Sequence, residues 1–328
     1  MSRSQLTSTV EQNTGGAVAP FAAGKNKIIN GDFGIWQRGT TTTSSGYATA
    51  DRWNNQATGT TTISQESSDL PTGFQYGIKF VTSASSSFGQ FKTFLERGTV
   101  IPMRGQVVTI SAYVKISGGY TGSWIGQVYY SNSSDSSASV TTQVGLNAAI
   151  ASSATSSWAR VSFQATIPTD AVGLGVFFVP DSVQASGATV RMTGVQLEAG
   201  SVATPFTTAT GTLSGELAAC QRYYYRNANG STYNGYGSGI STSTSNAVVL
   251  VNLPVAMRIA PTAVDYSTLG ITDNATYQLA LANLYLTYAS PTSVVLSCPT
   301  AVGQTQYRPA QLTNQNSTSG YLGFSAEL

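Results

Sequence analysis

Apolar and polar residues alternate along several segments of the chain, which is the pattern of strands that bury one face. In the segment 107–116 the apolar positions are Val108, Ile110, Ala112, Val114 and Ile116. In the segment 159–167 they are Val161, Phe163, Ala165 and Ile167. Both segments predict half-buried strands of an antiparallel sheet.

Two further segments depart from simple alternation. The segment 172–179 is apolar throughout its second half, which predicts a strand at the centre of the core. In the segment 190–197 the apolar positions change parity part of the way along. A β-bulge near Thr193 and Gly194 would account for that slip, because a bulge adds one residue to a strand.

Ser-, Gly- and Asn-rich joints separate these strands, and no helical period lies between them. Such spacing is typical of a β-sandwich or jelly roll. The exception is the segment 213–222, which predicts a helix of two to three turns with Ser214 as its N-cap. New strands are predicted after it, at 247–253, 276–287 and 293–297.

The sequence therefore predicts an all-β protein of four parts. These are an N-terminal extended arm over 1–25, a jelly-roll β-sandwich over 26–210, the short helix, and a smaller C-terminal β-sandwich, with the last two together spanning 211–328. No period of 20–50 residues is visible, which argues against a β-helix.

The amino-acid composition indicates how such a chain folds and remains solvated. Only 9% of its 328 residues are charged, whereas Ser and Thr make up about a quarter of it. Hydroxyls and amides must therefore do the solvating that charges usually do. With 41% hydrophobic and 10% aromatic residues, the chain has enough apolar side chains to bury a core rather than remain disordered.

The residues that are missing exclude several functions. The chain has no His, which removes Ser-His-Asp catalysis and His-ligated metals. Its two cysteines, Cys220 and Cys298, form no metal-binding motif, and we expect them to be reduced in a protein assembled inside a cell. A net charge of +2 without a basic cluster argues against nucleic acid.

We also expect no membrane insertion, because no apolar run approaches the ~18 residues that span a bilayer. The first residues lack the apolar core of a secretory signal.

Several motifs together resemble a known family. The sequence KIINGDFGIWQRG, followed by Tyr47 and ADRW, resembles the start of the jelly-roll module in many tailed-phage fibre proteins. VQLEAG followed by TPF resembles the end of that module, and later segments resemble the junction into a C-terminal β-domain and its terminus. The matching segments are 27–39, 50–53, 195–206, 216–224 and 320–328.

The resemblance implies a virion protein, namely a homotrimeric tail fibre or receptor-binding subunit. Its arm would attach to a tail or baseplate protein, and its β-domains would bind host-surface polysaccharide or lipopolysaccharide. It would be assembled in the host cytoplasm and located in the tail of the virion.

The first domain is also similar to carbohydrate-binding jelly rolls that accompany plant-cell-wall hydrolases. Those modules often hold a structural Ca²⁺ between Asn-Gly-x-Phe-Glu in the first strand and Asp-x-Val-x-Leu in the last. Here Gly34 and Thr193 stand at the positions of that Glu and Asp, and Asp32 and Glu198 remain nearby as oxygen donors. Calcium held by Asp32 and Glu198 is the one cofactor that the resemblance raises, and the two replacements argue against it.

Sugar binding suits this composition, because sugars are held by aromatic rings under their C–H faces and by amides and hydroxyls at their edges. The strand-like segment 120–130 offers Trp124 and Tyr129, for which core and site both stay open. A Gly-containing loop offers Tyr233, Asn234 and Tyr236. The remaining tryptophans are expected in the core, at positions 36, 53 and 158.

Catalysis has less support. A glycosidase needs two carboxylates about 5–10 Å apart, and no spacing among the 14 acidic residues singles out a pair. We therefore predict a glycan-binding subunit that is not an enzyme. Two alternatives stay open: a structural capsid decoration or baseplate protein without glycan binding, and a polysaccharide depolymerase.

Overall fold

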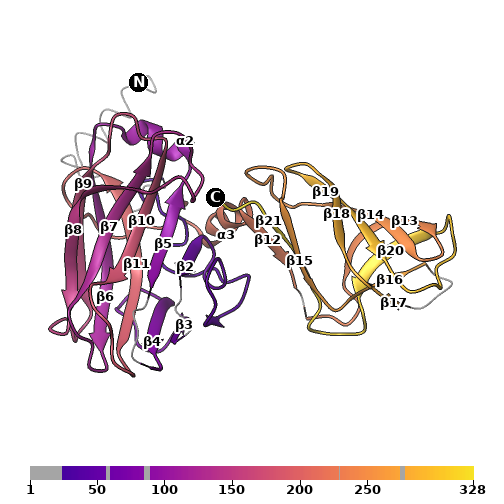
Figure 1. Cartoon of the computed structure of the whole chain (residues 1–328), viewed down its shortest axis with the longest axis horizontal. Helices are drawn as coiled ribbons and strands as arrows, with labels where there is room; N and C mark the ends of the chain where they lie inside the picture. Colours follow the sequence, from indigo (N-terminus) through magenta and orange to yellow (C-terminus); the bar gives the residue numbers. More distant parts are fainter. Residues whose placement is uncertain (1–23, 57–59, 85–88, 229, 274–277) are drawn as a thin grey trace, which may run out of the picture. The chain divides into compact units, whose positions relative to one another are not determined.

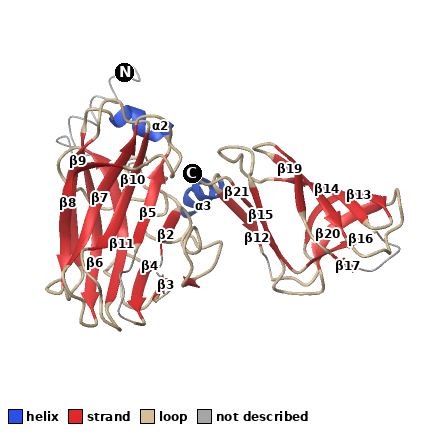
Figure 2. Ribbon diagram, viewed as in Figure 1, coloured by secondary structure: helices blue, strands red, loops and turns tan. Residues whose placement is uncertain are grey.

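Strands are the main regular secondary structure of the described residues, as the sequence predicts. The structure is a computed structural model, and it describes residues 24–328 except 57–59, 85–88, 229 and 274–277. Within these residues, helix is limited to α2 (Arg97–Val100), the 3₁₀ helix η1 (Ile101–Met103) and α3 (Leu213–Gln221), as Figures 1 and 2 show. The all-β prediction is confirmed. Of the predicted arm, residues 1–23 lie outside the described part.

The chain divides into two compact units. The first comprises Met1–Leu217 with Leu328, and the second comprises Ala218–Glu327. The division therefore falls inside α3, a few residues after the boundary at 210/211 that the sequence predicts. No helix in the described residues is both long and apolar enough to cross a membrane.

The first unit is a jelly-roll sandwich of two antiparallel sheets. One sheet has six strands in the order β1 (Thr41–Thr42), β3 (Thr61–Glu66), β4 (Gly77–Thr82), β11 (Thr189–Ala199), β6 (Val107–Ser117) and β9 (Ala159–Thr166). The other has five strands in the order β2 (Trp53–Gln56), β5 (Gln90–Leu95), β10 (Gly173–Pro180), β7 (Ser123–Ser131) and β8 (Thr142–Ser152).

The alternation in the sequence fixes which face of each strand enters the core of this unit. The five apolar positions predicted for β6 are all buried, whereas Tyr113 and Lys115 between them are half-buried. From the second sheet, Trp53 stacks on Phe91 with ring centroids 4.7 Å apart. One contiguous core cluster joins residues of both sheets, so each sheet buries the apolar face of the other.

The predicted bulge lies where the parity of apolar residues changes. The register between β11 and β6 shifts between Thr193 and Gln196. Gly194 adopts a φ of +61° there, a conformation that few other residues tolerate. A Cβ on Gly194 would lie 2.7 Å from the Phe74 ring, so the glycine also makes room for that ring.

The second unit also has two antiparallel sheets. Three strands pair in the order β12 (Tyr224–Asn227), β21 (Tyr321–Ser325) and β15 (Ala263–Ser267). Seven pair in the order β17 (Leu279–Ala280), β16 (Leu269–Thr272), β20 (Pro309–Asn314), β13 (Gly235–Ser243), β14 (Asn246–Asn252), β19 (Ser293–Pro299) and β18 (Tyr285–Ala289). A core of this unit's own includes Val249, Leu296 and Phe324.

Two local predictions need correction. The single strand expected over 276–287 is in fact the short β17 and the separate β18. Between them the Asn283 side chain accepts a hydrogen bond from the Leu284 N–H, a local bond that competes with the strand ladder. The helix α3 begins at Leu213, so its cap is Thr212, whose hydroxyl accepts a hydrogen bond from the Gly215 N–H at 3.0 Å. Ser214 is not the cap.

Cys220 and Cys298 are both buried, and no disulfide joins them. Burial raises the pKa of the Cys298 thiol to about 12.

Candidate ligand-binding sites on the jelly roll

Two rows of side chains cross the outer face of the five-stranded sheet. In the first row, Phe94, Gly175, Tyr129 and Gln143 lie opposite one another on β5, β10, β7 and β8. In the second row, Lys92, Phe177 and Gln127 lie opposite one another on β5, β10 and β7. Their sequence neighbours on the same strands point into the core, so these two rows point away from it.

Gly175 explains why aromatic rings gather on this face. A Cβ at this position would lie 2.5 Å from Phe177 and 3.2 Å from Phe94. Without it, the Phe177 ring packs against Tyr129 with centroids 4.5 Å apart and edge-on against Phe94 at 5.7 Å. Phe94 and Phe177 are buried with Val140, whereas Tyr129 is half-buried. Tyr129 is therefore the ring in this cluster that a ligand can reach.

Amide side chains continue the face beyond the rings. The Asn147 carbonyl oxygen accepts hydrogen bonds from Gln127 Nε2 at 2.8 Å and from Gln143 Nε2 at 2.6 Å. The Tyr129 hydroxyl reaches Gln143 Oε1 at 3.5 Å. Each amide has two donors and an acceptor, and Gln143 and Asn147 are exposed, so these two side chains can bond hydroxyls of a ligand.

One cation lies on the other side of the rings. Lys92 Nζ lies 5.2 Å from the centroid of Phe177 and donates a hydrogen bond to Gln90 Oε1 at 3.1 Å. Burial lowers the pKa of Lys92. A cavity of about 260 Å³ is lined by Gln90, Lys92, Phe94, Tyr129, Ser137, Val140, Thr141 and Phe177. We name Gln90, Lys92, Gln127, Tyr129, Gln143 and Asn147 the Tyr129 face.

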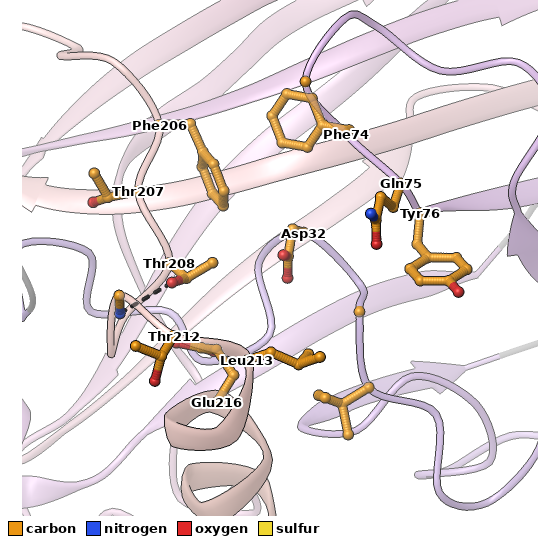
Figure 3. Close-up of a pocket in the computed structure, with 14 residues that line it drawn as sticks. Asp32, Phe74, Gln75, Tyr76, Phe206, Thr207, Thr208, Thr212, Leu213 and Glu216 are labelled. Atoms are coloured by element: carbon orange, nitrogen blue, oxygen red, sulfur yellow. Dashed lines mark hydrogen bonds between the residues drawn. The ribbon is translucent and has the colours of Figure 1, made fainter. Parts of the chain in front are cut away.

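A larger cavity, of about 580 Å³, lies beside the β11 bulge (Figure 3). Phe74 and Phe206 form one wall, with ring centroids 5.2 Å apart, and Tyr76 lies at the side. The first turn of α3 contributes Leu213 and Glu216. We name this space the Asp32 pocket, after the carboxylate that points into it.

The two carboxylates of the Asp32 pocket have different surroundings. Asp32 accepts hydrogen bonds from its own N–H and from that of Gly34, and burial and the charge of Glu216 together raise its pKa. Glu216 is 2% exposed and accepts hydrogen bonds from the Asn30 N–H at 2.8 Å and from the N–H and hydroxyl of Thr210. The Glu216 carboxylate therefore links the backbone at Asn30 to the backbone at Thr210, whereas the Asp32 carboxylate faces the cavity.

The structure separates the glycan-binding candidates predicted from sequence. Trp124 is wrong as a site residue, because it is fully buried in the core beside Phe80, with ring centroids 5.7 Å apart. Tyr236 is also wrong, because it is 8% exposed and its hydroxyl donates to Asn314. Tyr129 lies on the outer face described above.

The other two candidates belong to the second unit. Tyr233 is 48% exposed, and its hydroxyl donates to Asn316 Oδ1 at 3.0 Å. Asn234 is half-buried and donates to Asn227. No cavity described here is lined by either residue.

Sequence reasoning missed most of the Tyr129 face. Lys92, Gln127, Gln143 and Asn147 were not predicted as site residues. A glycine inside an apolar strand, such as Gly175, signals a close approach of other groups. Gln127 gives a second signal. A polar residue within a largely apolar strand indicates that the outer face of the strand contacts polar groups.

The residues near the expected calcium position do not fit that ion. Glu198 is 3% exposed, and its oxygens accept hydrogen bonds from Thr204 and Gln196 and pair with Lys25 at 3.4 Å. The Thr193 hydroxyl donates to the Tyr76 carbonyl. Asp32 lies in the pocket beside Glu216, and the described residues contain no cluster of three acidic or cysteine side chains that would hold a metal.

Comparison with known proteins finds similar structures but no matching family. No family model matches the chain, and no curated protein matches it. The structure is similar to the enzymatically active domain of bacteriophage CBA120 tailspike protein 4, at 11% identity and a TM-score of 0.36 over 56% of this chain. The match spans only 22% of that domain's length.

Two carbohydrate-binding modules are also similar in structure. The tandem CBM22-1–CBM22-2 domain of Paenibacillus barcinonensis Xyn10C matches at 11% identity and a TM-score of 0.35, covering 93% of this chain and 98% of that one. TmCBM61, solved in complex with β-1,4-galactotriose, matches at 13% identity and a TM-score of 0.34, covering 53% of this chain and 99% of that one. The neighbours of this chain thus include carbohydrate-binding modules and a phage tailspike domain.

Proposed function

We propose that this protein is a tail-fibre or receptor-binding subunit of a phage virion that binds host-surface glycan through the Tyr129 face. The observation that carries glycan binding is the arrangement of a reachable tyrosine ring beside a chain of three amides on one sheet face. The ring suits the C–H face of a pyranose, and the amides suit its hydroxyls.

The charge of this face supports a neutral ligand. None of its six residues is acidic, and its one cation, Lys92, lies over aromatic rings and bonds Gln90. Neutral polysaccharide or the neutral part of a lipopolysaccharide matches such a surface. Binding by one site is expected to be weak, and a homotrimer would raise it through effective concentration.

Glycan arrays and calorimetry with host polysaccharide test the binding site. Replacing Tyr129 and Asn147 together by Ala should abolish measurable binding, because the change removes the ring and the shared acceptor of the amide chain. Tyr307→Ala is a matched control, since Tyr307 is 74% exposed and lies in the second unit. Full retention of binding by the double variant would contradict the proposed site.

The virion role rests on the fibre-like motifs of the sequence and has its own test. Antibody labelling of intact virions, viewed by electron microscopy, should mark the tail or baseplate. Label spread over the head would instead indicate a capsid decoration subunit, which is the structural alternative.

The absence of catalysis is likewise part of the proposal. The protein should release no reducing ends from host polysaccharide that it binds. Release of reducing ends by the purified protein would identify a depolymerase, the remaining alternative.

A further inference from the structure

The Asp32 pocket is chemically unlike the Tyr129 face. Its volume of about 580 Å³ falls within the range of small-molecule sites. Phe74 and Phe206 supply aromatic surface, and both side chains are half-buried rather than closed off. Gln75, Tyr76 and Leu213 are more exposed and lie around the opening.

The pocket also has a net negative charge. Two carboxylates, Asp32 and Glu216, are among its lining residues, and no Lys or Arg is among the described residues that line it. In Figure 3 the Asp32 carboxylate points into the space between the phenylalanine rings and the first turn of α3. Among the described residues, the groups that donate hydrogen bonds to Glu216 are the Asn30 N–H and the N–H and hydroxyl of Thr210, and none of them is a cation.

We infer that the Asp32 pocket binds the ammonium group of an amino sugar, as a second saccharide site distinct from the Tyr129 face. The cation would pair with Asp32 and reduce its repulsion by Glu216. The faces of Phe74 and Phe206 favour a cation electrostatically and also suit the C–H groups of the sugar ring. A neutral sugar would gain only the contact between its C–H groups and the two rings.

Hydrolysis fits this pocket less well than binding, although it holds two carboxylates. A glycosidase needs the second carboxylate free to act on water or on the sugar. Both oxygens of Glu216 already accept hydrogen bonds from the backbone of the protein, and the side chain is 2% exposed. Asp32 is left as the one carboxylate that a ligand can approach.

Calorimetry and saturation-transfer NMR on the full chain test the inference, with glucosamine, N-acetylglucosamine and glucose as probes. At a pH where its amine is protonated, glucosamine should bind about tenfold more tightly than the two neutral sugars, a typical gain for a charged contact over a π-face. This preference should weaken as salt is raised, since salt screens the ion pair.

Four variants make the result specific. Asp32→Asn should remove the preference for glucosamine while keeping an acceptor for the Gly34 N–H, and Phe206→Leu should weaken glucosamine binding several-fold. Asp170→Asn is the matched control, since Asp170 bonds Asn132 and does not line the pocket. Tyr129→Ala should not reduce the preference for glucosamine over glucose, because Tyr129 does not line the pocket.

Equal binding of glucosamine and glucose, or an undiminished preference in Asp32→Asn, would overturn the inference. Displacement of glucosamine by Ca²⁺ at low concentration would also overturn it, because the pocket would then be a metal site.

Discussion

The two outer faces of the jelly roll differ in how their polar side chains are paired. On the six-stranded sheet, Lys79, Arg191 and Lys115 lie opposite one another on β4, β11 and β6. Two carboxylates neutralise them: Glu66 lies 3.0 Å from Arg191 and 3.6 Å from Lys79, and Asp69 lies 2.8 Å from Lys115. On the Tyr129 face, amides and rings take the place of this ion network.

The difference separates structure from recognition. On the ion-paired face each carboxylate is used by groups of the protein itself, and Asp69 also accepts a hydrogen bond from the Trp158 indole at 3.1 Å. On the Tyr129 face the amides bond one another, and Gln143 and Asn147 are exposed, where a ligand can reach them. We therefore expect changes on the first face to alter stability alone, and changes on the second to alter binding.

Phe177→Ala gives the largest expected effect, because Phe177 supports the Tyr129 face from below. The substitution should lower the free energy of unfolding by about 3 kcal/mol, as for other buried phenylalanines, and should also weaken glycan binding by freeing the Tyr129 ring. Urea unfolding and calorimetry measure the two effects. A loss below about 0.5 kcal/mol, which is typical of exposed positions, would mean that the ring cluster does not hold the face together.

Glu66→Gln should have a somewhat smaller effect, of about 2 kcal/mol in unfolding free energy. The change removes one partner of a buried ion pair and leaves Lys79 and Arg191 with less compensation. Glycan affinity should stay at the level of the unmodified protein. Asp170→Asn, at an exposed carboxylate, should change stability by less than about 0.5 kcal/mol and serves as the control. Altered glycan binding in Glu66→Gln would break the distinction between the faces.

The sequence predicted the sandwich well because its strands alternate cleanly. The five apolar positions of β6 are buried as expected, and the parity change in β11 marks the bulge between Thr193 and Gln196. Alternation assigns a residue to a face but does not say whether that face is covered. Trp124 shows this, since its position on β7 suited either side and the structure places it in the core.

The candidate sites could not be predicted for a related reason. Each depends on residues brought together from distant strands, such as Gln127 with Asn147, or Asp32 with Glu216. The strand 172–179 was expected to be core alone, whereas Phe177 turns to the outer face and joins a second, smaller cluster. Only the pairing register, which is absent from a single sequence, aligns Gly175 with Tyr129.

Lowering the pH should reduce the stability that the ion-paired face contributes, and moderate acidity should have a smaller effect than the substitutions above. Burial alone would raise the pKa of Glu66, but hydrogen bonds from Ser68, Asp69 and Arg191 outweigh it and lower the pKa from 4.5 to about 2. Folding therefore favours the charged form, and this stability is present above pH 4.5 and is lost as the pH falls towards 2. At pH 3 only part of it should be lost.

Unfolding measured in urea from pH 7 to pH 3 checks this expectation. Glu66→Gln should show a shallower decline than the unmodified protein, since its side chain at position 66 does not titrate. Asp69 should still contribute, because the hydrogen bond from Lys115 lowers its pKa. Parallel declines for the two proteins would contradict a stabilising role of the Glu66 carboxylate.

Tyr129→Phe should have the smallest effect and shows which part of the tyrosine matters. The hydroxyl lies 3.5 Å from Gln143 Oε1, a long and weak hydrogen bond, whereas the ring packs on Phe177 at 4.5 Å. Glycan affinity should therefore fall only about twofold, corresponding to roughly 0.4 kcal/mol. A tenfold or larger loss in calorimetry would mean that the hydroxyl bonds the sugar directly, and that the ring is not the main contact on this face.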